Sequence, residues 1–274
     1  MPAPALHDTG PFAPCPAPFN LAAHVLAAAA LTPAKVALEV LSAPGVVAER
    51  WRYDALAEAV LRTAGGLAAL GVGRGDRVML RIGNSSDFPV VFFAAAALGA
   101  VAVPTSAMLT VSEVAGVIAT IRPRVICLGA GLDLPAAPGT AVIGPGAIAG
   151  LRVHAPAAIA PTAPDDPAFM VMTSGSGGHP KGVLHAHRAA WARRMMWDGW
   201  YGLGPGDRML HAGAFNWTYT LGAGLTDPLA AGATALVYTG PADRHVWPAL
   251  AAAHGATIFA AVPGGAGRDG EPET

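Results

Sequence analysis

A run of glycine and hydroxyl residues that ends in a lysine is the segment best suited to chemistry. It comprises, in order, Thr173, Ser174, Gly175, Ser176, Gly177, Gly178, His179, Pro180, Lys181 and Gly182. Glycines let backbone N–H groups approach a phosphate without obstruction, and small hydroxyls add neutral donors. Lys181 adds a positive charge, worth about 4 kcal/mol toward an anion at about 4 Å and an effective dielectric constant of about 20, before desolvation is subtracted. The run is therefore predicted to bind phosphate.

Two common nucleotide-binding patterns do not fit this run. A Walker A loop needs G-x-x-x-x-G-K followed by Ser or Thr, whereas Pro180 precedes the lysine here and Gly182 follows it. The dinucleotide pattern G-x-G-x-x-G is also absent from the run, and Gly144, Gly146 and Gly150 approach it only loosely. By composition alone the run is also typical of a flexible connector. The order of its residues therefore has to decide between these interpretations.

The elements around the run alternate between helical and strand-like patterns, which predicts an α/β fold. An apolar strand over residues 169–172 precedes the run, and a helical segment over about 187–197 follows it. We expect the N-terminus of that helix to favour a bound anion by about 0.3–2 kcal/mol.

The remaining segments predict a largely parallel sheet flanked by helices. Thr110 and Glu113 have the spacing of a capping box at the start of one of these helices. A region rich in Gly, Pro and Ala over 129–167 is predicted to be a linker around one or two short strands. Strands are predicted over residues 77–82, 100–103, 125–128, 233–238 and 257–262, and helices over 53–70, 88–98, about 111–121 and about 244–254.

The order of residues in the run resembles the phosphate-binding signature of adenylate-forming enzymes, which include acyl-CoA and aryl-CoA synthetases, luciferases and the adenylation domains of peptide synthetases. The usual form of that signature is Thr-Ser-Gly-Ser/Thr-Thr-Gly-x-Pro-Lys-Gly. Gly177 departs from it, because the family usually carries a hydroxyl at this position. One donor to pyrophosphate would be lost there, and the loop would be more mobile.

The resemblance extends over residues 20–263, and within the family the sequence most resembles the benzoate- and aminobenzoate-CoA ligase branch. Residues 71–78 resemble the family's G-V-x-x-G-D-x-V turn, and residues 98–104 its G-A-V-x-V-P strand. Residues 218–238 are similar to the segment behind the acyl pocket. The resemblance implies that the acyl pocket includes Trp217, Tyr219 and Gly222, with Trp217 at a gate position. Trp217 and Tyr219 could equally be core residues.

The implied activity is that of an ATP-dependent acid–CoA ligase acting on an aryl or small acyl acid. In that family a carboxylate and Mg²⁺-ATP give an acyl adenylate and pyrophosphate, and the thiolate of CoA then displaces AMP. The physical task is to make a poor electrophile reactive while the charge of the leaving pyrophosphate is neutralised. ATP, Mg²⁺, CoA and a small-molecule carboxylate are therefore the implied ligands, and no catalytic residue is identified.

Several parts of the family pattern do not occur in these 274 residues. They are the Tyr-Gly-x-Thr-Glu motif for adenine and Mg²⁺, the Thr-Gly-Asp ribose motif and the C-terminal domain. The implied organisation is a flexible lead-in over 1–19, a partial AMP-binding N-terminal domain over 20–263 and a disordered tail over 264–274. The chain on its own is expected to be inactive. Two other hypotheses stay open: a non-catalytic remnant that binds a phosphate or acyl ligand, and a half-enzyme completed by a separate chain.

Composition narrows the function classes further. The 17 basic and 18 acidic residues give a net charge of −1, which offers no basic surface for nucleic acid or an anionic membrane. Cys15 and Cys127 have no metal-type spacing, which favours a reduced, cytoplasmic compartment. His185 and His187 could face the same side of a strand as metal ligands, but no third ligand has a suitable spacing. We therefore interpret them as the polar start of a helix and predict no metal site.

Overall fold

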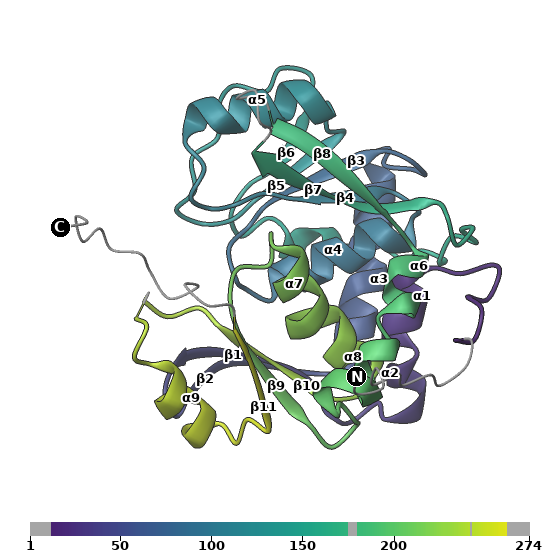
Figure 1. The fold of residues 1–274 in the computed structure, drawn as a ribbon. Coiled ribbons are helices and arrows are strands. Elements are labelled where there is room, and N and C mark those ends of the chain that lie inside the picture. Colours follow the sequence, from purple (N-terminus) through teal and green to yellow (C-terminus); the bar gives the residue numbers. More distant parts are fainter. Residues whose placement is uncertain (1–11, 175–179, 242, 262–274) are drawn as a thin grey trace, which may run out of the picture.

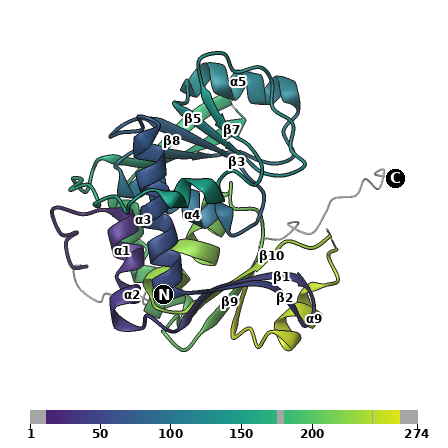
Figure 2. The same ribbon diagram turned by 180° about the vertical axis from the view of Figure 1, so that it is seen from behind.

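The structure is a computed structural model, which describes residues 12–174, 180–241 and 243–261. Two β-sheets lie on either side of a central layer of helices (Figure 1, Figure 2). One further helix, α5, covers the outer face of the first sheet, and another, α9, covers the outer face of the second. The predicted helix-flanked α/β architecture is confirmed.

The first sheet has six strands in the order β6-β5-β3-β4-β7-β8. The pairs from β6 to β7 are parallel, and β8 is antiparallel to β7. This order confirms the expected largely parallel sheet. The strands are β3 (Arg77–Arg81), β4 (Val101–Pro104), β5 (Val125–Leu128), β6 (Ala141–Ile143), β7 (Pro167–Ser174) and β8 (Pro180–Ala186).

The second sheet has five strands in the order β11-β9-β10-β1-β2. Its three C-terminal strands pair in parallel with one another, β1 pairs in parallel with β10, and β2 folds back antiparallel to β1. The sequence had predicted β10 and β11 but neither β1, β2 nor β9. The strands are β1 (Val36–Ala43), β2 (Val46–Arg52), β9 (Arg208–Ala212), β10 (Thr234–Tyr238) and β11 (Ile258–Ala261).

The core follows from the alternation of side chains along the strands. In β3, Val78 and Leu80 point into the main core between the sheets, whereas Met79 points to the cluster beneath α5. Helix α4 (Asp87–Ala97) is buried on nearly every side, as its uninterrupted apolar sequence predicts. The other helices are α1 (Leu21–Leu26), α2 (Ala28–Leu31), α3 (Tyr53–Ala69), α5 (Val111–Ile121), α6 (Arg188–Ala192), α7 (Thr218–Leu221), α8 (Asp227–Ala230) and α9 (Trp247–Ala253), with the 3₁₀-helix η1 (Ala149–Val153) and the π-helices η2 (Trp197–Tyr201) and η3 (Gly222–Thr226).

Local signals set the ends of two of these helices. The predicted capping box of α5 is present: the Thr110 hydroxyl accepts from the Glu113 N–H at 3.3 Å, and the Thr110 N–H donates to the Glu113 carboxylate at 2.8 Å. Helix α3 is followed by Gly71, whose φ of 79° lies in the left-handed region that favours glycine. Among the described helices, none is long and apolar enough to cross a membrane.

One prediction about the surroundings of the glycine-rich run was wrong. The segment after the run forms strand β8, and the next helix, α6, begins only at Arg188. Seven register pairs with β7 hold this segment as a strand. The expected continuous helix over 187–197 is instead the short α6, followed after a turn by η2. No helix N-terminus therefore follows the run directly, and that contribution to anion binding is removed.

Of the two terminal segments, only a part is described. Residues 12–19 form no helix or strand, and Phe12 and Phe19 both contact the ring of Trp191, with ring centroids 6.5 Å and 5.9 Å from it. The flexibility of the lead-in stays a prediction. The predicted disordered tail over 264–274 lies outside the described residues.

Candidate active site

The β7–β8 hairpin carries the glycine-rich run at its tip. Thr173 is opposite Lys181, and Ser174, the last residue of β7, is opposite Pro180. The Thr173 hydroxyl lies 3.4 Å from the Lys181 carbonyl oxygen. Gly175, Ser176, Gly177 and Gly178, predicted to bind pyrophosphate, lie outside the described residues. The hairpin thus brings the two ends of the predicted phosphate loop together.

One face of this hairpin borders a cavity. Directly opposite residues of an antiparallel pair point to the same face, so Phe169, Val171 and Thr173 share a face with the register partners His185, Val183 and Lys181. The cavity has a volume of about 630 Å³, within the range of small-molecule sites. Its lining residues are Val171, Met172, Thr173, Val183, His185, Asn216, Trp217 and Thr218. Lys181 is exposed on the same hairpin face.

The three residues predicted for the acyl pocket have different surroundings. Trp217 precedes α7, is 68% exposed and lines the 630 Å³ cavity. Gly222 lines a second, smaller cavity. Tyr219 is not among the lining residues of either cavity; its ring packs edge-on against His211, with centroids 4.9 Å apart, and lies beside Trp200. The assignment of all three to an acyl pocket stays a prediction.

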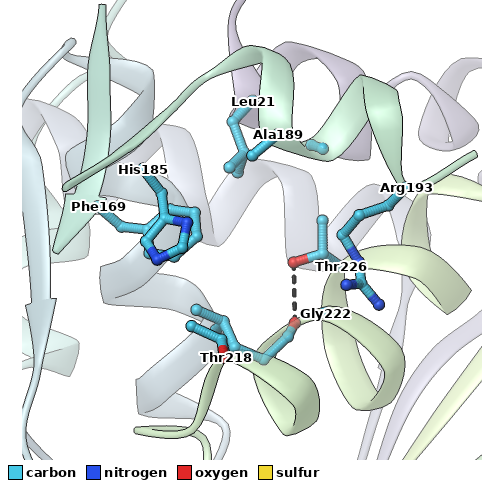
Figure 3. A pocket seen from close by; sticks show the side chains of 10 residues that line it. Leu21, Phe169, His185, Ala189, Arg193, Thr218, Gly222 and Thr226 are labelled. Carbon is cyan, nitrogen blue, oxygen red and sulfur yellow. Dashed lines mark hydrogen bonds between the residues drawn. The ribbon is translucent and has the colours of Figure 1, made fainter. Parts of the chain in front are cut away.

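The smaller cavity has a volume of about 130 Å³, and we call it the inner cavity. Figure 3 shows its residues converging from the β7–β8 hairpin, α1, α6 and the α7–η3 segment. It is lined by Leu21, Phe169, His185, Ala189, Ala190, Arg193, Thr218, Leu221, Gly222 and Thr226. His185 and Thr218 line both cavities, so the two cavities adjoin at these side chains.

A buried ion pair stands at one side of the inner cavity. Arg193 Nε donates to Asp227 Oδ1 at 2.8 Å, and Arg193 Nη2 donates to Asp227 Oδ2 at 2.6 Å and to the Tyr201 hydroxyl at 3.0 Å. The Asp227 side chain is only 1% exposed. Burial alone would lower the pKa of the Arg193 guanidinium, but hydrogen bonding to Asp227 outweighs it and raises that pKa. Burial raises the pKa of the Asp227 carboxyl, and its hydrogen bonds to Arg193 act in the opposite direction. The bidentate contact has the geometry of an ion pair.

His185 and His187 have separate structural roles. The ring of His185 stacks on Phe169 with centroids 4.5 Å apart, and burial lowers its pKa. The fully buried His187 accepts a hydrogen bond at Nδ1 from the Leu21 N–H at 3.0 Å. Within the described ranges, no group of three or more His, Cys, Asp or Glu side chains is placed to hold a metal ion.

Sequence reasoning had missed His185, Thr218 and Arg193 as cavity residues. The alternation of Val183 and His185 along β8 could have placed His185 beside Val183, had the segment been recognised as a strand. Nothing in the sequence separates Arg193 from the adjacent Arg194, because only packing shows that one pairs with the buried Asp227 and the other stacks on Trp191.

Comparison with known proteins identifies the fold and then the family. A crystal structure of a benzoate CoA ligase from Burkholderia xenovorans LB400 superposes with a TM-score of 0.79 at 26% identity, covering 88% of this chain and 50% of that one. The family described as "AMP-binding enzyme" matches residues 25–266. The chain belongs to this family.

Two curated relatives show the spread of the similarity. The long-chain-fatty-acid–CoA ligase FadD13 of Mycobacterium tuberculosis is 36% identical over 174 residues, which cover 59% of this chain and 34% of the relative. The 3-hydroxybenzoate–CoA/4-hydroxybenzoate–CoA ligase of Thauera aromatica is 31% identical over 235 residues, which cover 77% of this chain and 44% of the relative. The chain thus matches less than half the length of these curated relatives.

Proposed function

We propose that this chain is the acid-activating, N-terminal part of an AMP-forming acid–CoA ligase for aryl or small acyl acids. The carrying observation is the β7–β8 hairpin, which holds Thr173 and Lys181 at the ends of the glycine-rich run beside a 630 Å³ cavity. Membership of the AMP-binding family supports it, as do relatives named for CoA ligation of fatty and hydroxybenzoic acids.

In this proposal each group has a defined task. Thr173, Ser174, Gly175, Ser176, Gly177, Gly178 and Lys181 bind the phosphates of ATP, and the cavity lined by Trp217 and Thr218 receives the acid. Mg²⁺ enters as part of the Mg²⁺-ATP substrate, and CoA is the second substrate. Lys181 stabilises negative charge that develops on pyrophosphate as it leaves, which is the main electrostatic demand of the reaction. A cytoplasmic location belongs to the same proposal, and a separate chain that supplies further ligase residues stays a prediction.

The test is the binding of pyrophosphate and ATP by calorimetric titration. Lys181→Ala should weaken binding by about fivefold, because an exposed charge at contact distance contributes about 1 kcal/mol in water. Raising the ionic strength from about 0.1 M to about 1 M shortens the screening length from about 10 Å to about 3 Å, so the effect should shrink. Gly177→Thr should tighten binding slightly by adding a donor and stiffening the free loop.

Arg188→Ala is the matched control. Arg188 is an exposed basic residue at the start of α6 that pairs with Asp165 and lines neither cavity. It should leave pyrophosphate binding within twofold of the unaltered chain. Equal affinity in the unaltered chain and in the Lys181→Ala and Gly177→Thr variants would show that the run does not bind phosphate, and the proposal would then fail.

A further inference from the structure

The inner cavity has the size of a single ring. Its volume of about 130 Å³ is close to that of an engineered apolar cavity of about 150 Å³ that binds benzene. Leu21, Phe169, Ala189, Ala190 and Leu221 supply apolar surface on several sides. The cavity adjoins the larger one at His185 and Thr218, which line both.

Arg193 brings hydrogen-bond donors to this apolar site. A guanidinium has five N–H donors, and in Arg193 the Nε and Nη2 atoms are turned to Asp227 and Tyr201. Within the described part of the chain, no hydrogen bond involves Nη1. Arg193 lines the inner cavity, with its guanidinium beside Thr226 (Figure 3). The two N–H groups of Nη1 are therefore without a hydrogen-bond partner among the described residues.

The absence of a side chain at Gly222 leaves room for the Arg193 guanidinium beside the inner cavity. A Cβ atom at this position would stand 2.2 Å from Arg193 Cζ and 2.5 Å from Nε. Any side chain would displace the guanidinium from its contact with Asp227. Gly222 thus contributes to the cavity through the space that it leaves.

The charge balance limits what the free donors can accept. Asp227 is buried and neutralises Arg193, so the pair as a whole carries no net charge. A second carboxylate would share one guanidinium with Asp227 in an apolar pocket, and burying an unbalanced charge is costly. A neutral acceptor, such as a hydroxyl or carbonyl oxygen, has no such cost.

We propose that the inner cavity binds the ring of the substrate acid and that Arg193 Nη1 donates a hydrogen bond to a neutral acceptor on that ring, away from the reacting carboxylate. The substrate class is then monocyclic acids that carry a hydroxyl or carbonyl substituent. Arg193 is a specificity-determining residue in this arrangement. The inference rests on the proposed function, because it requires that the larger cavity holds a carboxylate.

The test compares acids of nearly equal shape by titration against the purified chain. Benzoate, 3- and 4-hydroxybenzoate, 3- and 4-methylbenzoate and terephthalate are the probes. A methyl group has nearly the size of a hydroxyl but accepts no hydrogen bond. At least one hydroxy acid should bind on the order of tenfold tighter than its methyl counterpart, and terephthalate should bind more weakly than either.

Two variants assign this preference to Arg193. The double variant Arg193→Met/Asp227→Leu removes the ion pair as a unit, so no buried charge is left unpaired, and should abolish the preference for hydroxy acids. Arg194→Met is the matched control, because Arg194 stacks on Trp191 with its Cζ 4.0 Å from the ring centroid and does not line the inner cavity. It should keep the preference. Circular dichroism melts verify that both variants are folded.

The outcomes separate this inference from the proposed function. Equal affinity for hydroxy and methyl acids, or a preference that survives in the double variant, overturns the role of Arg193. Tightest binding of terephthalate overturns the argument from charge balance. If pyrophosphate binds but none of the acids does, the inference fails while the phosphate site stands. If neither pyrophosphate nor any acid binds, the proposed function itself fails.

Discussion

Removing the carboxylate of Asp227 should destabilise the protein more than removing any exposed acidic side chain. Asp227 is 1% exposed and makes bidentate contact with Arg193, at 2.8 Å and 2.6 Å. Asp227→Ala leaves the guanidinium without its counter-charge, and breaking a buried pair in this way typically costs about 3–5 kcal/mol. Because the Arg193 side chain is 23% exposed and can partly reach solvent, we expect a value near the lower limit.

A loss of about 3 kcal/mol corresponds to a fall in Tm of about 6–12 °C for a protein of this size class. The assay is thermal and urea unfolding followed by circular dichroism. Arg193→Met/Asp227→Leu should unfold within about 1 kcal/mol of the unaltered chain, because apolar residues of similar volume often replace a buried ion pair without loss. The single variants Arg193→Met and Asp227→Leu, together with the double variant, give the coupling energy of the pair.

Glu58→Ala provides the comparison on the surface. Glu58 pairs with Arg62 one helical turn away, and both side chains are well exposed, so its removal should cost less than about 0.5 kcal/mol. If Asp227→Ala costs no more than Glu58→Ala, the charge of Asp227 is not buried as described. If the double variant loses as much as the two single variants combined, the residues do not act as a pair.

Two further predictions concern stability. Burial lowers the pKa of His187 and of His211 to about 4, so the unfolded chain binds more protons than the native one between pH about 4 and about 6.5, and the free energy of unfolding should fall as the pH drops through this range. His211→Leu should make this pH dependence weaker in urea titrations at pH 7.5 and 5.0, with little loss of stability at pH 7.5 because both ring nitrogens lack a partner among the described residues. An unchanged difference in stability between the two pH values would contradict this assignment. Thr110→Ala should destabilise the protein by about 1 kcal/mol in urea unfolding, because α5 loses its N-terminal cap. Ser112→Ala, at an exposed position of the same helix, should have little effect. Equal effects of the two substitutions would show that the capping box is not stabilising.

The sequence predicted those elements whose local pattern agrees with their tertiary surroundings. Strand β5 begins and ends where expected, and α5 begins at its predicted capping box. Strand β1 was not predicted because its central Glu39 looks like a surface residue, although Arg50 and Arg208 neutralise it at 2.8 Å and 2.6 Å. Strand β8 was mistaken for the approach to a helix because its stability comes from pairing with β7, a non-local contribution.

The candidate site was predictable in part for the same reason. Thr173 and Lys181 belong to a contiguous motif, so the order of residues was sufficient to single them out. The inner cavity instead combines residues from six separate elements, and Leu21 and Thr226 have no relation in the sequence that would connect them. The pairing of Arg193 with Asp227 likewise depends on the tertiary arrangement that brings the end of α6 to the start of α8.

The connectivity of the two sheets has a consequence for how the chain folds as it is synthesised. All strands of the six-stranded sheet lie between residues 77 and 186, so this sheet can form before the C-terminal third of the chain has left the ribosome. Strand β1 instead pairs with β10, and the hydroxyl of Thr234 donates to the Val36 carbonyl oxygen across a separation of 198 residues. Contacts of such long range close slowly, because the loop entropy must be lost before the pairing is gained. The β1–β2 hairpin is synthesised long before β10, so we expect the unpaired edge of β1 to be open to pairing with other nascent chains until β10 is available.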